Sequence, residues 1–350
     1  MTTPSAQTDR FVHDRLPPRD QWPELRYDLP ELRIADQANL VERLLDGAAA
    51  RGWADRPLLR SPQITFTYAE TRERVDRIAN YLVHELKLEP GNRVLLRGGN
   101  SIGMALSWLA VVKAGLIAVA TMPLLRAVEL GKVIDKAQPV AAICDARLLQ
   151  ELEQAQQAFP ALQHVLRFNS PDDPSDLGQL VAHQAATFTA CPTSADDIAL
   201  LAFTSGTTGA PKAVVHTHRD VLAACEAWPR HVLRPTSDDI VTGSPPLAFT
   251  FGLGGLLLFP MWAGASIYYP DANYNPETMV RQMREQGVTT CYTSPTFYRQ
   301  LAPHMKAIGV PSLRTCVSAG EALPDATRQL WKDATGIFFF NDTAATEMFH

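Results

Sequence analysis

The sequence predicts an α/β protein of two stacked α/β lobes with mostly parallel sheets. Short apolar segments of strand type alternate with amphipathic helical segments along most of the 350 residues. This alternation is typical of βαβ units. The chain is also longer than one hydrophobic core usually supports. Two loose stretches, 169–176 and 187–197, interrupt the alternation and indicate a boundary between the lobes.

The expected organisation is an arm over 1–34, a first lobe over 35–190 and a second lobe over 191–350. The arm is rich in proline and charge, which favours extended backbone. Trp22 and Tyr27 are expected to pin it to the body of the protein. The part before Asp14 is equally compatible with a disordered tail.

The first lobe opens with apolar residues at helical spacing over 39–51, ended by Gly52. Thr67 is expected to cap a second helix, which carries an apolar face from Val75 to Val83, and Glu70 completes a capping box. Further helices are expected over 100–113, 129–136 and 147–158, and strands over 64–68, 93–96, 116–120, 140–144 and 165–168.

The second lobe repeats the alternation. Thr217 and Asp220 form a second capping-box pattern, which opens a helix ending at Trp228. Further helices are expected over 279–286 and 327–334, and strands over 240–242, 288–293, 315–318 and 337–340.

Composition excludes several classes of partner. The net charge of −5 and the isoelectric point near 6 give no reason to expect nucleic acid or an anionic membrane. The longest apolar run, 253–262, is too short to span a bilayer and contains a proline, so it is expected in the core. The first residues carry no signal-peptide pattern. The five widely spaced cysteines contain no C-x-x-C pair, which is typical of reduced thiols in a cytoplasmic protein.

The strongest candidate for a ligand-binding site is a loop between two apolar runs, 200–203 and 213–215. Its glycines allow a tight turn and close approach to a ligand, its backbone N–H groups suit anions, and its hydroxyls and lysine suit a polyphosphate. The residues concerned are Thr204, Ser205, Gly206, Thr207, Thr208, Gly209 and Lys212. A flexible linker is the alternative. A Walker loop fits poorly, because Pro211 stands at its second glycine and Ala213 follows the lysine.

The nine residues from Thr204 to Lys212 resemble the signature loop of the adenylate-forming (AMP-binding) superfamily of acyl-CoA synthetases, luciferases and peptide-synthetase adenylation domains. The resemblance runs from about Trp22 to the end and is strongest to aryl-CoA ligases of the benzoate and 2-aminobenzoate kind. It implies the large N-terminal domain of such an enzyme, incomplete at its C-terminal end. It also implies that the signature loop (204–212) holds the β- and γ-phosphates of ATP, with Lys212 as a catalytic residue.

Two more segments receive roles from the resemblance. Phe249, Phe251 and Gly252 are expected beside the acid, because a flat aromatic substrate suits apolar and aromatic walls; a plain core position is the alternative. Residues Ala319, Gly320 and Glu321 follow a strand's carboxyl end, where open α/β sheets bind ligands, and are expected against adenine and the acid. The alternative for Glu321 is a carboxylate in the first turn of a helix.

The resemblance also assigns the α-phosphate to Thr346 and Mg²⁺ to Glu347, an oxygen ligand that suits this cation. Ala344 departs from the family pattern, in which glycine is usual, and residues 338–342 are an unusual lead-in. His216 and His218 are spaced for a metal on a strand, but no third ligand is near in sequence, so a structural role is favoured.

The function implied is ATP-dependent activation of an aromatic carboxylic acid to an acyl-adenylate and then to an acyl-CoA thioester. ATP, Mg²⁺ and coenzyme A are the implied cofactors and co-substrates, and a homodimer is compatible. The family's hinge and small C-terminal domain, with its lysine, have no counterpart in the chain, so weak activity is expected of this polypeptide alone. Two alternatives stay open: a catalytically inactive nucleotide-binding fragment, and an adenylation domain that feeds a carrier protein.

Overall fold

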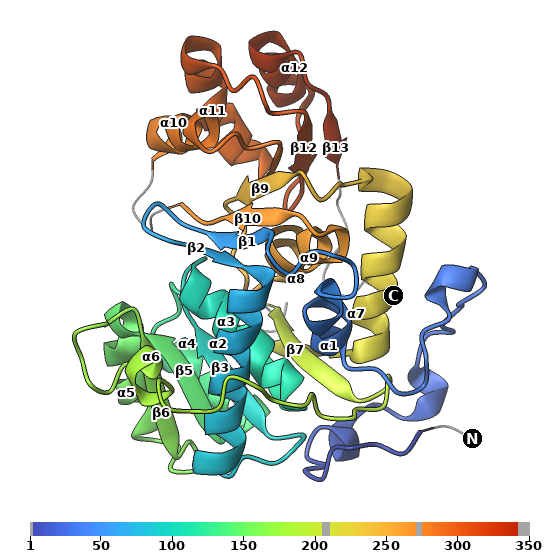
Figure 1. Cartoon of the computed structure of the whole chain (residues 1–350), viewed down its shortest axis with the longest axis vertical. Helices are drawn as coiled ribbons and strands as arrows, with labels where there is room; N and C mark the ends of the chain where they lie inside the picture. Colours follow the sequence, from blue (N-terminus) through green and yellow to red (C-terminus); the bar gives the residue numbers. More distant parts are fainter. Residues whose placement is uncertain (1–2, 205–210, 271–274, 342–350) are drawn as a thin grey trace.

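The computed structural model describes residues 3–204, 211–270 and 275–341, and it contains two sheets with helices between and outside them (Figure 1). The first sheet has the order β6-β5-β3-β4-β7-β8, and its neighbours are parallel except for the β7–β8 hairpin. Its strands are β3 (Arg93–Arg97), β4 (Ile117–Thr121), β5 (Ala141–Asp145), β6 (His164–Phe168), β7 (Ile198–Thr204) and β8 (Lys212–Thr217).

The second sheet has the order β13-β12-β11-β9-β10-β1-β2, and its neighbours are parallel except for β1–β2. Its strands are β1 (Pro57–Arg60), β2 (Thr65–Thr67), β9 (Ile240–Gly243), β10 (Ser266–Tyr268), β11 (Thr290–Thr293), β12 (Thr315–Ser318) and β13 (Phe339–Asn341). The predicted fold class, α/β with two mostly parallel sheets, is therefore confirmed.

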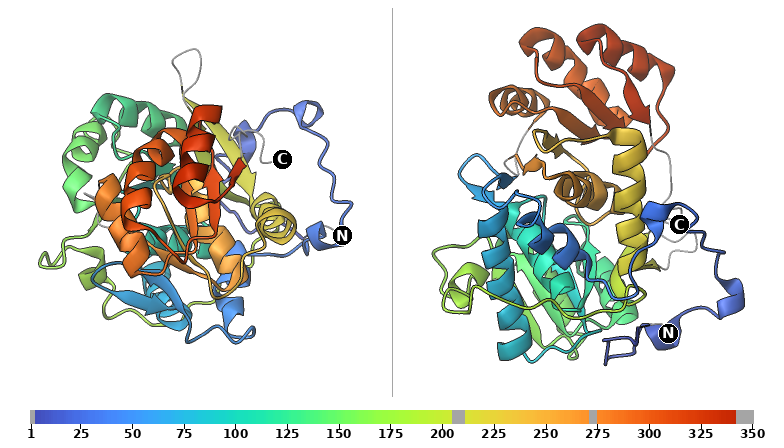
Figure 2. Two further views of the ribbon diagram at one scale, coloured as in Figure 1. Left: turned by 90° about the horizontal axis from the view of Figure 1, so that it is seen from above. Right: turned by 45° about the vertical axis from the view of Figure 1, so that its right-hand side comes forward.

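The helices complete a layered structure. They are α1 (Leu40–Leu44), α2 (Tyr68–Asn80), α3 (Ile102–Lys113), α4 (Ala127–Ala137), α5 (Leu149–Gln156), α6 (Leu177–Leu180), α7 (His218–Trp228), α8 (Thr250–Leu253), α9 (Phe259–Ala263), α10 (Pro276–Glu285), α11 (Pro295–Ile308) and α12 (Asp325–Thr335). One core joins both sheets to α1, α2, α3 and α7, a second lies between the first sheet and α4 and α5, and a third lies between the second sheet and α10, α11 and α12. Figures 1 and 2 show α10–α12 at one end of the molecule and α7 beside both sheets.

The strand pattern explains these cores. In β3, Val94 and Leu96 face the central core, whereas Leu95 faces the core under α4 and α5. In β11, Tyr292 faces the central core and Cys291 faces α10–α12. Successive side chains point to opposite faces and both faces are covered, so both strands are buried along their whole length instead of alternating between buried and exposed residues.

Most predicted elements are present, and both predicted capping boxes, at Thr67 and at Thr217, are confirmed. The helix expected over 39–51 is shorter than predicted, because α1 ends at Leu44 and a 3₁₀ turn over Asp46–Ala48 follows. The run 253–262 is core, as expected. The sequence analysis did not identify β1, β10 and α11.

The sheets draw strands from both sides of residue 190. The β1–β2 hairpin comes from the first half of the chain and joins the second sheet, whereas β7 and β8 join the first. The division into lobes at this residue stays a prediction. In the arm, Gln7 donates from Nε2 to the Ile198 carbonyl at 2.7 Å, so the segment before Asp14 is attached to the first sheet. Tyr27 lies under the guanidinium of Arg219 at 5.9 Å.

None of the helices in the described part of the chain is long and apolar enough to cross a membrane.

Candidate functional site

The signature loop closes the β7–β8 hairpin. Thr204 and Lys212 face each other as the last registered pair of the antiparallel ladder, and the Lys212 side chain is exposed. The two bracketing strands expected from the sequence are therefore present, and they bring these two predicted residues together. Ser205, Gly206, Thr207, Thr208 and Gly209 lie outside the described residues.

The second predicted group follows β9 and forms the start of α8, with Phe249 at the N-cap and the next three residues in the helix. We refer to residues 249–252 as the aromatic turn. The Phe249 amide donates to the Pro246 carbonyl at 3.0 Å. A Cβ on Gly252 would lie 2.1 Å from the Pro246 carbonyl oxygen, so only glycine fits this close approach of two backbones. Phe251 packs against Tyr292 of β11, with ring centroids 5.8 Å apart.

The aromatic turn and the third predicted group leave the same edge of the second sheet. β9, β11 and β12 are adjacent parallel strands, so the segments after them leave from their shared carboxyl end. Thr293 at the end of β11 is in register with Ser318 at the end of β12, and its hydroxyl contacts that of Ser244 after β9. The edge is thus lined by hydroxyl residues where an open α/β sheet binds its ligands.

Residues 319–321 form the turn that follows β12. Ala319 is buried, whereas Gly320 is exposed with φ +87°, a conformation that favours glycine. Glu321 accepts a hydrogen bond from the Thr296 amide at 2.9 Å. Hydrogen bonds from the Thr296 backbone and side chain hold the pKa of the Glu321 carboxyl below its usual range.

Glu321 therefore caps a helix, but a different one from that expected. The alternative weighed from the sequence placed it in the first turn of the helix that follows it. That helix, α12, begins at Asp325, and Glu321 instead caps the N-terminus of α11, which starts at Pro295. The exposed N–H groups at a helix N-terminus attract a carboxylate. The interaction fixes the 319–321 turn against α11.

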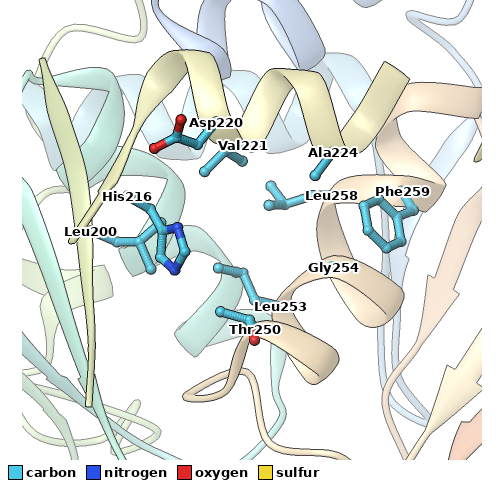
Figure 3. Close-up of a pocket in the computed structure, with 10 residues that line it drawn as sticks. All are labelled: Leu200, His216, Asp220, Val221, Ala224, Thr250, Leu253, Gly254, Leu258 and Phe259. Atoms are coloured by element: carbon cyan, nitrogen blue, oxygen red, sulfur yellow. The ribbon is translucent and has the colours of Figure 1, made fainter. Parts of the chain in front are cut away.

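An apolar pocket connects the signature hairpin to the aromatic turn (Figure 3). It encloses about 360 Å³ of empty space, part of it open to solvent. One wall comes from β7, β8 and α7 and the other from α8 and the residues after it. The lining residues are Leu200, His216, Asp220, Val221, Ala224, Thr250, Leu253, Gly254, Leu258 and Phe259. Its predominantly apolar lining suits an apolar group.

The two histidines of β8 and α7 lie in different surroundings. His216 lines the pocket, whereas His218 is fully buried and accepts a hydrogen bond at Nδ1 from the Leu40 amide at 3.1 Å. Burial lowers the pKa of His218 to about 3. Across the described ranges, no three His, Cys, Asp or Glu side chains gather as metal ligands. The predicted residues Thr346 and Glu347 lie outside these ranges.

Sequence reasoning missed Asn100 and the pocket residues of α7 and α8. Asn100 follows β3 and forms hydrogen bonds to the segment that leads into the aromatic turn. A lone Asn after two glycines has no local signal for such a role, because its partners come from the other sheet. Ala224 and Leu253 likewise have the pattern of ordinary core residues.

Comparison with known proteins identifies the class to which this fold and site belong. The family model described as "AMP-binding enzyme" matches residues 47–349. The chain therefore belongs to the AMP-binding enzyme family.

Several relatives are aryl-CoA ligases. Benzoate--CoA ligase of Thauera aromatica is 28% identical over 92% of this chain and 61% of the relative. Anthranilate--CoA ligase of Pseudomonas aeruginosa is 29% identical over 75% of this chain and 50% of the relative. The crystal structure of the anthranilate CoA ligase AuaEII in complex with anthranoyl-AMP gives a TM-score of 0.85 at 28% identity, covering 92% of this chain and 62% of that one. The chain thus spans about three-fifths or less of the length of these relatives.

Proposed function

We propose that the chain activates an aromatic carboxylic acid with ATP, first to an acyl-adenylate and then to a thioester of coenzyme A. The observation that carries the proposal is the nine-residue signature loop, borne on a hairpin whose stem shares an apolar pocket with the aromatic turn. The names of the benzoate and anthranilate relatives support an aromatic acid.

The reaction has two displacements. A carboxylate oxygen of the acid forms a bond to the α-phosphorus of ATP, the bond from that phosphorus to the bridging oxygen breaks, and pyrophosphate leaves. The thiolate of coenzyme A then attacks the acyl carbon, and AMP leaves with the former carboxylate oxygen. Negative charge is spread over phosphate oxygens throughout the first step, so donors fixed around them are the protein's main catalytic means.

Each predicted residue has a proposed role in this scheme. Thr204, Lys212 and the loop between them hold the leaving pyrophosphate. The backbone of Ala319 and Gly320 lies against adenine, because the Glu321 carboxylate is already bound to Thr296. Thr346 is proposed to bind the α-phosphate. Mg²⁺, which neutralises phosphate charge when bound, is assigned to Glu347 on the sequence pattern alone.

The acid is proposed to bind between the aromatic turn and the apolar pocket. Phe249 and Phe251 offer aromatic faces, and the pocket beside them has predominantly apolar walls. Such a site accepts flat, uncharged rings, while substituents of one or two atoms change its affinity by only about 1–3 kcal/mol. Benzoate and 2-aminobenzoate are therefore the first acids to test.

ATP–pyrophosphate exchange tests the proposal on the 350-residue chain. We expect exchange that depends on benzoate or 2-aminobenzoate and that falls about 100-fold or more in Lys212→Ala, because a donor to transition-state charge is removed. Lys306→Ala is the matched control, since Lys306 is an exposed lysine in the last turn of α11 and is not a predicted site residue.

The alternatives give different results in the same assay. ATP binding without acid-dependent exchange would indicate an inactive nucleotide-binding protein. Exchange accompanied by transfer of the acyl group to the thiol of a carrier protein, and not to coenzyme A, would favour an adenylation domain that feeds a carrier protein. Exchange that is equally strong in Lys212→Ala would contradict the role given to the signature loop.

A further inference from the structure

Asn100 links the two sheets at the aromatic turn. It follows β3 of the first sheet and precedes α3. Its Nδ2 donates to the Pro245 carbonyl at 2.8 Å, and its Oδ1 accepts from the Leu247 amide at 2.8 Å. One side chain thus pairs with a donor and an acceptor of the same backbone segment, as a neighbouring strand would.

The partners of Asn100 have few alternatives within their own segment. Pro245 and Pro246 contribute no N–H of their own. In the described part of the chain, the local backbone donor to their carbonyls is the Phe249 amide, which bonds to Pro246. Leu247 is buried, and its amide needs a partner. Removing the side-chain amide of Asn100 leaves the buried Leu247 N–H and the Pro245 carbonyl without this partner. Leaving a buried polar group unpaired costs more free energy than replacing both partners by apolar groups.

The contact is transmitted to the aromatic turn through close packing. Gly252 lies against the carbonyls of both prolines, since an added Cβ would lie 2.1 Å from the oxygen of Pro246 and 2.6 Å from that of Pro245. The segment 245–247, which Asn100 binds, therefore packs directly against the aromatic turn. Phe251, one residue before Gly252, is fixed on its other side by Tyr292.

We infer that Asn100 is a positioning residue that sets the place of Phe249 and Phe251 in the acid-binding site. It contacts the backbone of residues 245–247 rather than the acid. The inference rests on the proposed function for its effect on the acid, whereas the hold on the turn can be measured without any substrate.

Hydrogen exchange with mass spectrometry tests the hold on the turn in the 350-residue chain. In Asn100→Ala we expect exchange of the peptide 245–253 to be about tenfold faster or more, as befits the loss of two hydrogen bonds. Asn100→Asp keeps the acceptor for Leu247 and should retain part of the protection.

Asn80→Ala is the matched control. Asn80 also donates to two backbone carbonyls, those of Ala185 and Thr187 at 2.9 and 3.0 Å, but it does so on α2, away from the aromatic turn. We expect this variant to leave exchange of 245–253 unchanged. Equal exchange in Asn100→Ala and Asn80→Ala would overturn the inference.

Pyrophosphate-exchange kinetics test the consequence for the acid. We expect Asn100→Ala to raise the KM for benzoate about tenfold while the KM for ATP changes little, with partial recovery in Asn100→Asp. A faster-exchanging turn with an unchanged KM for benzoate would overturn the positioning role. If the wild-type chain shows no pyrophosphate exchange that depends on benzoate or 2-aminobenzoate, the proposed function is contradicted. The hydrogen-exchange measurement would then still test whether Asn100 holds the aromatic turn.

Discussion

At the scale of single residues, His218 couples the stability of the fold to pH. Its Nδ1 accepts from the Leu40 amide, so the ring carries its proton on Nε2, which is buried without a partner among the described residues. A second proton would have to be placed on Nδ1, facing the Leu40 N–H. The folded protein therefore favours the neutral form of this side chain, in agreement with the lowering of its pKa by burial.

The sign of the pH dependence follows from this. Below the ordinary pKa of 6.5, the unfolded chain binds a proton at His218 that the folded protein does not bind until about pH 3. The free energy of unfolding should therefore fall with decreasing pH, by about 1.4 kcal/mol per unit, or about 2 kcal/mol between pH 7 and pH 5.

Urea titrations at pH 7, 6 and 5 measure this slope. His218→Asn keeps an oxygen in the place of Nδ1 and should lose about 2 kcal/mol less than the wild type over this range. His183→Asn, at an exposed position, should keep the wild-type slope. The assignment fails if His218→Asn and the wild type lose equal stability.

At the scale of elements, the aromatic turn depends on one small residue. Gly252→Ala would drive a Cβ into the carbonyl oxygen of Pro246, a backbone atom that cannot move aside cheaply. We expect a loss of about 1–3 kcal/mol in the free energy of unfolding, the usual cost of overpacking. Gly99→Ala, with no atom within 4 Å of its added Cβ, should change stability by less than about 0.5 kcal/mol. Similar melting temperatures for the two variants would contradict the described packing.

Elements with a strong local signal could be predicted from the sequence. The capping boxes at Thr67 and Thr217 are local hydrogen-bonding patterns, so both helix starts were found. α11 was missed because it contains Pro303 within its span and prolines argue against a helix interior. β10 spans only Ser266–Tyr268, which is too short to show an alternating apolar pattern. β1 has four residues and begins with a proline, which also weakens the pattern of a strand.

The candidate site divides in the same way. The signature loop was found because the residues that make it chemically distinctive are consecutive. Asn100 and the cap that Glu321 gives α11 were not found, because each depends on a partner brought near by the sheets. A single sequence carries no trace of such a pairing.

At the scale of the whole molecule, a buried ion pair holds the central layer of helices. Lys113 of α3 is 1% exposed and donates to Asp76 of α2, which is 3% exposed, and to Asp46 at 2.7 Å. Burial nevertheless raises the pKa of Asp76, against the effect of Lys113. Burying the two charges therefore costs solvation free energy, and each charge is stabilised in the interior only while the other is present.

Lys113→Met should lower the free energy of unfolding by about 3–5 kcal/mol, because it leaves a carboxylate buried without its cation. Adding Asp76→Leu should recover most of this loss, since a well-packed apolar pair replaces the ions. Lys306→Met, at an exposed position on α11, is the control and should have little effect. These values come from urea denaturation, and a small loss in Lys113→Met would show that the two helices do not need the pair.

The exchange of strands between the sheets has a consequence for folding. During synthesis, the β1–β2 hairpin emerges early but cannot complete its sheet until β10 has followed, and β4 keeps an open edge until β7 arrives. Both closures join segments far apart along the chain, and such a high contact order slows folding and leaves apolar strand edges exposed meanwhile. The second sheet cannot be finished until every strand of the first has been made, although its β1–β2 hairpin is made before them all. Partly made chains of this protein are therefore expected to need protection from aggregation until β10 is free to pair.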